Sequence, residues 1–266
     1  MPAQNTDKSW EKLGQQNPFY WVTTMDEYID EKWNEETQAI FFDDSSKYVY
    51  NILKIINKHI DPEFKPISAL DFGCGVGRVS IPLSKSCKNV VGADVSSSML
   101  EAAEKLCKQQ NIDNIELIKS DDNLSEITGT FNFVHSIYVF QHIPFKRGKK
   151  ILKKILSSLE PDGVGVFQFL IKNELPASKK LIYWIKVNIP LAHNIFNIIK
   201  GKPWNTPMMQ LNNYNLNYIL QKLKENGCGH SYIRYTKEDY YHGVIIFFQK
   251  TEKNENNNFI ELGDIP

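Results

Sequence analysis

The stretch ISALDFGCGVG, residues 67–77, decides the fold. Its first half is a short apolar run ending at Phe72, as in a buried strand, and a helical pattern resumes over 76–86. Between them lies a turn that contains three glycines, Gly73, Gly75 and Gly77. Glycine lets the backbone turn tightly and removes the Cβ that would keep a ligand away. The stretch therefore predicts a strand, a ligand-binding loop and a helix in succession.

The same alternation of strand and helix continues along the chain. Repeated units of this length predict a parallel sheet with helices on both faces. We expect further strands over 89–94, 115–118, 131–137 and 164–170, helices over 44–60, 96–111, 145–159 and 211–227, and two closing strands over 231–237 and 243–250.

Three segments lie outside this rhythm. We expect an N-terminal arm over 1–43, of which 1–17 is loose, and a flexible tail over 251–266, around a single domain over 44–250. A helical insertion over 173–205 carries a surplus of apolar residues. It could form a lid over a pocket, extend the core or rest on a membrane surface, and we expect it to form a pocket wall with Tyr183 or Trp184 among the contacts.

Composition excludes several classes of protein. Lys and Arg together number 31, as do Asp and Glu, so net charge indicates neither a nucleic-acid nor an acidic partner. The four cysteines form no CxxC pair, and no metal site is expected. The N-terminus lacks the apolar core of a signal peptide, and no apolar run approaches the roughly 20 residues that span a bilayer. We expect a cytoplasmic protein.

The residues around the glycine turn discriminate between possible ligands. A dinucleotide fingerprint is G-x-G-x-x-G, but Arg78 stands where its third glycine would be. Asp71 lies two residues before the first glycine. Its negative charge would repel a pyrophosphate and attract an ammonium group. Asp94 ends the second strand, where a carboxylate can accept both hydroxyls of a ribose, although a surface or helix-capping role is the alternative.

Other polar residues follow the later strands. A carboxylate of the pair Asp121–Asp122 could accept a hydrogen bond from an adenine amine, or the pair could be a solvated loop. Met99 could pack on an adenine face or belong to the core. His142 is the best-placed general base because the pKa of histidine lies near neutrality, and a structural role for it is the alternative. His135 is expected to be core, and Tyr241 and His242 could line the far side of a pocket.

Five segments together carry a family resemblance. LDFGCGVGR, VVGADVSSSML, IKSDD, FNFVHSIYVFQHIP and LEPDGVGVFQF occur in this order over about 67–170. They resemble the successive motifs of class I S-adenosylmethionine-dependent methyltransferases, in particular a bacterial small-molecule type with an undefined acceptor. The resemblance implies a Rossmann-like, seven-stranded, mostly parallel sheet whose last strand is antiparallel.

The resemblance also implies roles for individual residues. Asp71 and the glycines Gly73, Gly75 and Gly77 would face the methionine part of S-adenosylmethionine. Asp94, with Val95 beside it, would hold the ribose, and Asp121, Asp122 and Met99 would lie at the adenine. Ser136 and Tyr138 would flank the sulfonium.

The same resemblance narrows the expected acceptor. After the fourth strand the chain reads His135-Ser136-Ile137-Tyr138, without the Asn/Asp-Pro-Pro-Tyr of enzymes that methylate base amines, and no Pro-Cys nucleophile motif occurs. We therefore expect transfer of a methyl group to an oxygen or nitrogen of a small molecule. Neither a nucleic-acid partner nor membrane contact is favoured. The alternatives are a nicotinamide-dependent oxidoreductase, which Asp71 and Arg78 disfavour, and a non-catalytic S-adenosylmethionine-binding module.

Overall fold

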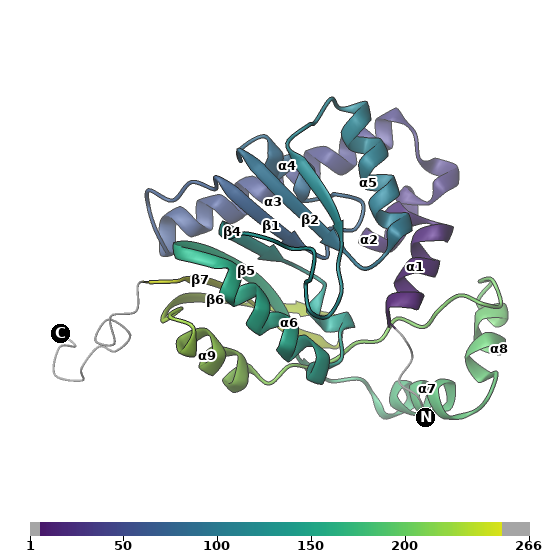
Figure 1. Ribbon diagram of the computed structural model, residues 1–266. Coiled ribbons are helices and arrows are strands. Elements are labelled where there is room, and N and C mark those ends of the chain that lie inside the picture. The colour runs from purple at the N-terminus through teal and green to yellow at the C-terminus, as the bar shows by residue number, and fades with distance from the viewer. Residues whose placement is uncertain (1–5, 252–266) are drawn as a thin grey trace.

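The computed structural model describes residues 6–251, and the predicted tail lies outside them apart from Thr251. Seven strands form one sheet in the order β3-β2-β1-β4-β5-β7-β6 (Figure 1). The strands are β1 Ser68–Phe72, β2 Asn89–Asp94, β3 Ile115–Lys119, β4 Phe131–Ser136, β5 Leu159–Asn173, β6 His230–Glu238 and β7 Tyr241–Gln249. Strands β1 to β5 pair in parallel, and β7 runs antiparallel to both β5 and β6. The predicted fold class is confirmed, including its antiparallel last strand.

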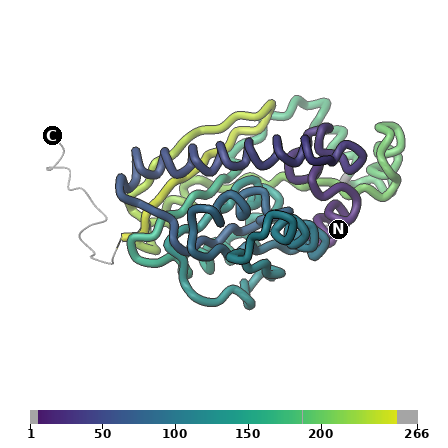
Figure 2. The backbone as a smooth tube through the Cα atoms, turned by 90° about the horizontal axis from the view of Figure 1, so that it is seen from above, coloured from purple at the N-terminus to yellow at the C-terminus, as the bar shows by residue number. Residues whose placement is uncertain are grey.

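Helices cover both faces of the sheet. They are α1 Thr6–Gln16, α2 Pro18–Thr23, α3 Glu35–His59, α4 Ser80–Ser84, α5 Ser97–Gln109, α6 Phe145–Ser158, α7 Ala177–Asn188, α8 Ala192–Ile199 and α9 Leu216–Glu225. Short 3₁₀ turns occupy Asp26–Tyr28, Asp30–Lys32 and Phe140–His142. Figure 2 shows α3 as one long helix that runs across the molecule.

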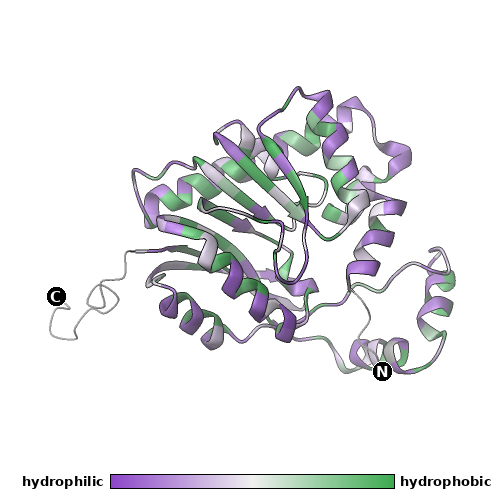
Figure 3. Cartoon of the chain, in the orientation of Figure 1, coloured by the Kyte–Doolittle hydropathy of each residue, from purple (hydrophilic) through white to green (hydrophobic). Residues whose placement is uncertain are grey.

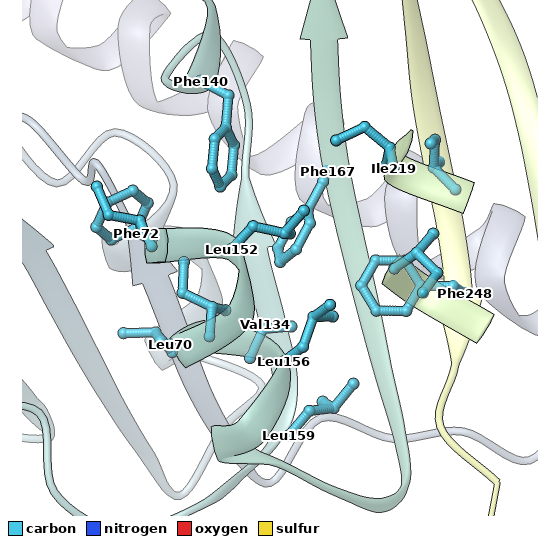
Figure 4. Packing of buried hydrophobic residues seen from close by; sticks show 14 of the residues in the cluster. Leu70, Phe72, Val134, Phe140, Leu152, Leu156, Leu159, Phe167, Ile219 and Phe248 are labelled. Carbon is cyan, nitrogen blue, oxygen red and sulfur yellow. The ribbon is translucent and has the colours of Figure 1, made fainter. Parts of the chain in front are cut away.

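The core divides according to the alternation of side chains along the strands. Leu70, Val134 and Phe167 point to the face that α6 and α9 cover, and Figure 4 shows them beside Leu152 and Ile219 of those helices. Their sequence neighbours on the same strands point to the opposite face, which α3 and α4 cover. Because both faces of the central strands β1, β4 and β5 are covered, these strands are mainly buried and apolar, as is typical of parallel sheets.

The N-terminal region departs from the predictions. Residues 6–16 were expected to be loose, but they form α1, and Leu13 is buried. Helix α3 begins at Glu35 rather than near 44, because Asn34 and Thr37 form a capping box at its start. The apolar pattern marks only the part of α3 that faces the sheet, so the first turns were missed.

The insertion forms two helices, α7 and α8, at the edge of the sheet where the parallel strands end (Figure 1). It lies beside the N-terminal helices in both backbone views (Figures 1 and 2). Within residues 6–251, no helix is both long enough and apolar enough to cross a membrane.

Candidate cofactor and acceptor site

A pocket of about 680 Å³ opens at the carboxyl ends of the parallel strands. This volume is typical of sites that hold small ligands. At one end the wall contains Asp94, Met99 and Asp121, and at the other end it contains Gln168 and Tyr241. The glycine turn lies between these ends, so a single pocket joins the predicted cofactor residues to the hairpin between β6 and β7.

The glycine turn requires glycine for two separate reasons. Gly73, Gly75 and Gly77 have φ values of 78°, 53° and 79°, in the left-handed region that other residues adopt only with strain. A Cβ on Gly73 would also lie 2.2 Å from Cγ2 of Val139. Gly73 and Gly75 line the pocket, whereas Gly77 does not and instead packs near Ile81. Gly77 therefore serves the turn itself.

Asp94 projects into the pocket from the end of β2. Its carboxylate accepts hydrogen bonds from the backbone N–H groups of Gly75 and Ser96, each at 2.9 Å. These bonds fix the carboxylate against the glycine turn. Burial raises the pKa of Asp94 to about 6, against an ordinary value of 3.8. Val95 and Met99 line the same end of the pocket.

Asp71 belongs to a buried chain of polar side chains. Its carboxylate accepts hydrogen bonds from Ser80 Oγ at 2.6 Å and from His135 Nδ1 at 2.8 Å. A carboxylate can only accept, so His135 carries its proton on Nδ1, and Nε2 accepts from the Tyr48 hydroxyl at 2.9 Å. Asp71, His135 and Tyr48 all line the pocket. His135, expected to be core, is buried but also reaches the site.

The two adjacent acids Asp121 and Asp122 have different surroundings. Asp121 lines the pocket, and hydrogen bonds from the backbone and hydroxyl of Ser125 lower the pKa of its carboxyl group. Asp122 is not part of the pocket wall and forms an ion pair with Arg147, which also binds Asp7 of α1 at 2.7 Å. Asp122 thus joins the loop after β3 to α6, and the same arginine joins α6 to α1.

His142 lies in the pocket wall in an apolar setting. Its Nδ1 donates to the carbonyl oxygen of Gln210 at 2.9 Å, and its ring meets that of Trp10 edge to face, with centroids 5.0 Å apart. Burial lowers the pKa of His142 to about 4. Its role as a general base stays a prediction, and this environment favours the neutral ring.

Ser136, the last residue of β4, and Tyr138, two residues later, have different surroundings. Tyr138 lines the pocket, is 54% exposed and has a φ of 61°. Its N–H donates to Gln168 Oε1 at 2.8 Å, which fixes the backbone that presents the ring. Ser136 is buried and does not line the pocket.

Several parts of the pocket wall were not predicted. Helix α1 contributes Asp7 and Trp10, and Glu11 beside them accepts hydrogen bonds from the hydroxyls of Ser96 and Ser98. Helix α3 contributes Tyr48, and Tyr241 comes from the start of β7 as suggested. His242 instead pairs with Glu174 at 2.9 Å. No residue of 173–205 lines the pocket, so the expected wall contacts of Tyr183 and Trp184 are absent in the described part of the chain.

Comparisons with known proteins agree with this geometry. A methyltransferase-domain family matches residues 69–163. Norajmaline N-methyltransferase of Rauvolfia serpentina is 25% identical over 144 residues, which are 52% of this chain and 48% of that protein. A 23S rRNA (uracil(1939)-C(5))-methyltransferase of Legionella pneumophila is 28% identical over 96 residues, 36% of this chain and 21% of that protein. This chain therefore spans about half or less of these two curated relatives.

The fold has close counterparts among solved structures. Magnesium protoporphyrin IX methyltransferase from Synechocystis PCC 6803, crystallised with S-adenosylhomocysteine, aligns with a TM-score of 0.60 and 17% identity. The alignment covers 92% of this chain and 98% of that one. Residues 69–163 thus match a methyltransferase-domain family, and the chain as a whole shares its fold with a methyltransferase that binds S-adenosylhomocysteine.

Proposed function

We propose that this protein transfers the methyl group of S-adenosylmethionine to an oxygen or nitrogen of a small molecule. The observation that carries the proposal is the single pocket, which runs from Asp94 past the glycine turn to Tyr138 and Tyr241. A methyltransferase needs such a pocket because both reactants must meet in line at one carbon. Relatives named for norajmaline and for magnesium protoporphyrin IX support a small-molecule acceptor.

The residues present fit the cofactor. Asp94 offers a fixed carboxylate to the two hydroxyls of a ribose, and Met99 and Asp121, which line the pocket beside it, would lie at the adenine. Gly73 and Gly75 leave room for the methionine part beside the buried charge of Asp71. When bound, the cofactor supplies a methyl group that its sulfonium already activates. Ser136 and Asp122 take no direct part in this assignment, because they point away from the pocket or into the ion pair with Arg147.

An acceptor that must lose a proton needs a group to receive it. Tyr48 keeps its own proton at neutral pH because burial raises its pKa well above the ordinary value. It can take a proton from an acceptor hydroxyl while it passes its own to Nε2 of His135, and the Asp71 carboxylate stabilises the resulting imidazolium. His142 remains the second candidate, although its lowered pKa makes it the weaker base.

Cofactor binding is tested without knowledge of the acceptor. S-adenosylmethionine or S-adenosylhomocysteine at a hundredfold excess over its Kd is expected to add about 2.7 kcal/mol to the free energy of unfolding. Thermal melting in the presence of each compound, with NAD as the control, measures the effect. Stabilisation by NAD and by neither adenosyl compound would contradict the assignment and favour the oxidoreductase. Cofactor binding without turnover across a broad panel of acceptors would favour a non-catalytic module.

The base is tested once a panel screen has supplied a hydroxyl acceptor. Tyr48→Phe is expected to lower kcat by about 10²–10⁴-fold and to leave cofactor affinity unchanged. His142→Gln is the matched variant in the same pocket, and its effect on kcat is expected to be smaller. Steady-state kinetics between pH 6 and 9 measure both. If His142→Gln abolished the reaction and Tyr48→Phe did not, the base would be His142.

A further inference from the structure

The insertion over 173–205 presents an apolar surface to solvent. Ten of the sixteen large apolar side chains exposed in the described residues lie in it: Leu181, Ile182, Tyr183, Trp184, Ile189, Leu191, Ile195, Ile198, Ile199 and Trp204. Figure 3 shows α8 as mainly hydrophobic and α7 as mixed. So many exposed apolar side chains gathered in one segment of a folded protein indicate a site of interaction.

Hydrogen bonds hold α8 against the segment that follows it. The side-chain amide of Asn197 donates to the carbonyl oxygen of Thr206 at 2.9 Å, and His193 Nε2 contacts the same oxygen at 2.8 Å. Asn194 donates to the carbonyl oxygen of Trp204 at 2.8 Å. These bonds join α8 to the segment that follows it, so the apolar side chains project from a defined scaffold.

Charge decides what the surface binds. The insertion contains five lysines, Lys179, Lys180, Lys186, Lys200 and Lys202, and the sequence has no Asp or Glu between Leu175 and Lys224. Among the described residues, no carboxylate forms an ion pair with any of the five. Burial and the charges of Lys200 and Lys202 lower the pKa of Lys186, so at least these three lysines lie within reach of one another.

This combination identifies the partner. Apolar side chains, tryptophans and lysines without acids are typical of helices that lie in the headgroup region of a membrane. A second copy of the chain fits poorly, because pairing two such surfaces would bring ten lysines together. We propose that the insertion docks this protein on a bilayer that carries anionic headgroups.

The position of the insertion determines how the pocket would be oriented relative to the bilayer. Lys202 lies over the ring of Trp21 at 5.4 Å, and Trp21 lines the pocket. Lys179 lies over the ring of Tyr240 at 4.3 Å, in the hairpin that forms the other end of the wall. The insertion thus flanks the pocket at two places, and docking through it sets the pocket beside the bilayer surface.

Vesicle sedimentation with the full chain tests the proposal. Vesicles of phosphatidylcholine with 30% phosphatidylglycerol are expected to bind the protein, and pure phosphatidylcholine vesicles are expected to bind it at least tenfold more weakly. Lys200→Gln with Lys202→Gln should weaken binding about 10–25-fold, since each lysine near an anionic surface contributes about fivefold. Ile198→Ser with Ile199→Ser should weaken binding more than tenfold without unfolding the protein, because both side chains are exposed.

Matched controls separate this surface from the rest of the molecule. Lys153→Gln with Lys154→Gln removes two exposed charges from α6, and Tyr50→Ser removes an exposed apolar side chain from α3. Both variants are expected to bind vesicles like the unaltered protein. The proposal is overturned if the unaltered protein does not bind the anionic vesicles, or if the α6 variant loses as much binding as the insertion variants. A dimer that Ile198→Ser with Ile199→Ser dissociates, in the absence of vesicle binding, would instead assign the surface to a second copy.

Discussion

Gly73→Ala is expected to lower the free energy of unfolding by about 2–5 kcal/mol and to abolish measurable binding of S-adenosylmethionine. The left-handed φ of 78° costs a residue with a Cβ about 1–2 kcal/mol. The new Cβ would lie 2.2 Å from Val139 Cγ2, and relief of such a clash costs about 1–3 kcal/mol more. Because Val139 and Gly73 both line the pocket, the shift also displaces the cofactor loop. Urea unfolding and calorimetry measure the two effects.

Gly129→Ala is the matched control for this prediction. Gly129 has a φ of 83°, but a Cβ there would meet nothing within 4 Å. Gly129→Ala is therefore expected to lower the free energy of unfolding by the backbone strain alone, about 1–2 kcal/mol. Its cofactor binding is expected to stay unchanged. Val139→Ala combined with Gly73→Ala should recover part of the lost stability. Equal losses for Gly73→Ala and Gly129→Ala would show that the contact with Val139 does not matter.

Asp94→Ala is expected to weaken cofactor binding by about 1.5–3 kcal/mol, or about 10–150-fold, because two hydroxyls lose a charged acceptor. The affinity of the unaltered protein should also fall as pH drops through about 6, where Asp94 becomes protonated, by up to tenfold per pH unit. Titration calorimetry between pH 5 and 8 measures both effects. The variant should show no such fall, and an unchanged affinity at pH 7.5 would reject the role in ribose binding.

Asp94 should have the opposite effect on the free energy of unfolding of the ligand-free protein, which should rise as pH falls. Its pKa in the folded protein, about 6, lies above the ordinary 3.8, so the folded state binds the proton more tightly. Protonation of Asp94 contributes on the order of 1–3 kcal/mol to the free energy of unfolding of the ligand-free protein. This contribution is complete below pH 4 and is lost as pH rises through 6. Asp94→Asn should remove this pH dependence from the ligand-free protein, which urea unfolding at pH 4 and pH 7 can measure.

The strands and the glycine turn could be predicted because their signals are local. The second strand was predicted at the observed bounds, Asn89–Asp94, since an apolar run there ends in a carboxylate and a helix cap. The position of Ser136 could also have been read from the sequence. Side chains alternate along β4, so Ser136 shares the α6 face with Val134, while His135 points with Phe133 toward α3.

The wall that α1 supplies could not be predicted in the same way. Helix α1 has few buried side chains, and its contacts are polar and reach residues far along the chain, such as Ser96 and Arg147. The periodicity of apolar residues predicts buried helix faces, but it cannot predict polar contacts between residues that are far apart in the sequence. The different surroundings of Asp121 and Asp122 were hidden for a related reason: two adjacent acids look alike in sequence, and only the placement of Arg147 on α6 separates them.

Because the pocket is continuous, adenosine bound at one end could hold chemical fragments at the other end, where the acceptor is expected to bind. A compound that joins adenosine to a chemical fragment through a short tether could occupy both ends without a passage having to open between Asp94 and Tyr241. Tethering raises the local concentration of the fragment to the millimolar range, so fragments too weak to detect alone become visible. The fragments that gain most would outline the shape and polarity of the natural acceptor before any turnover has been observed.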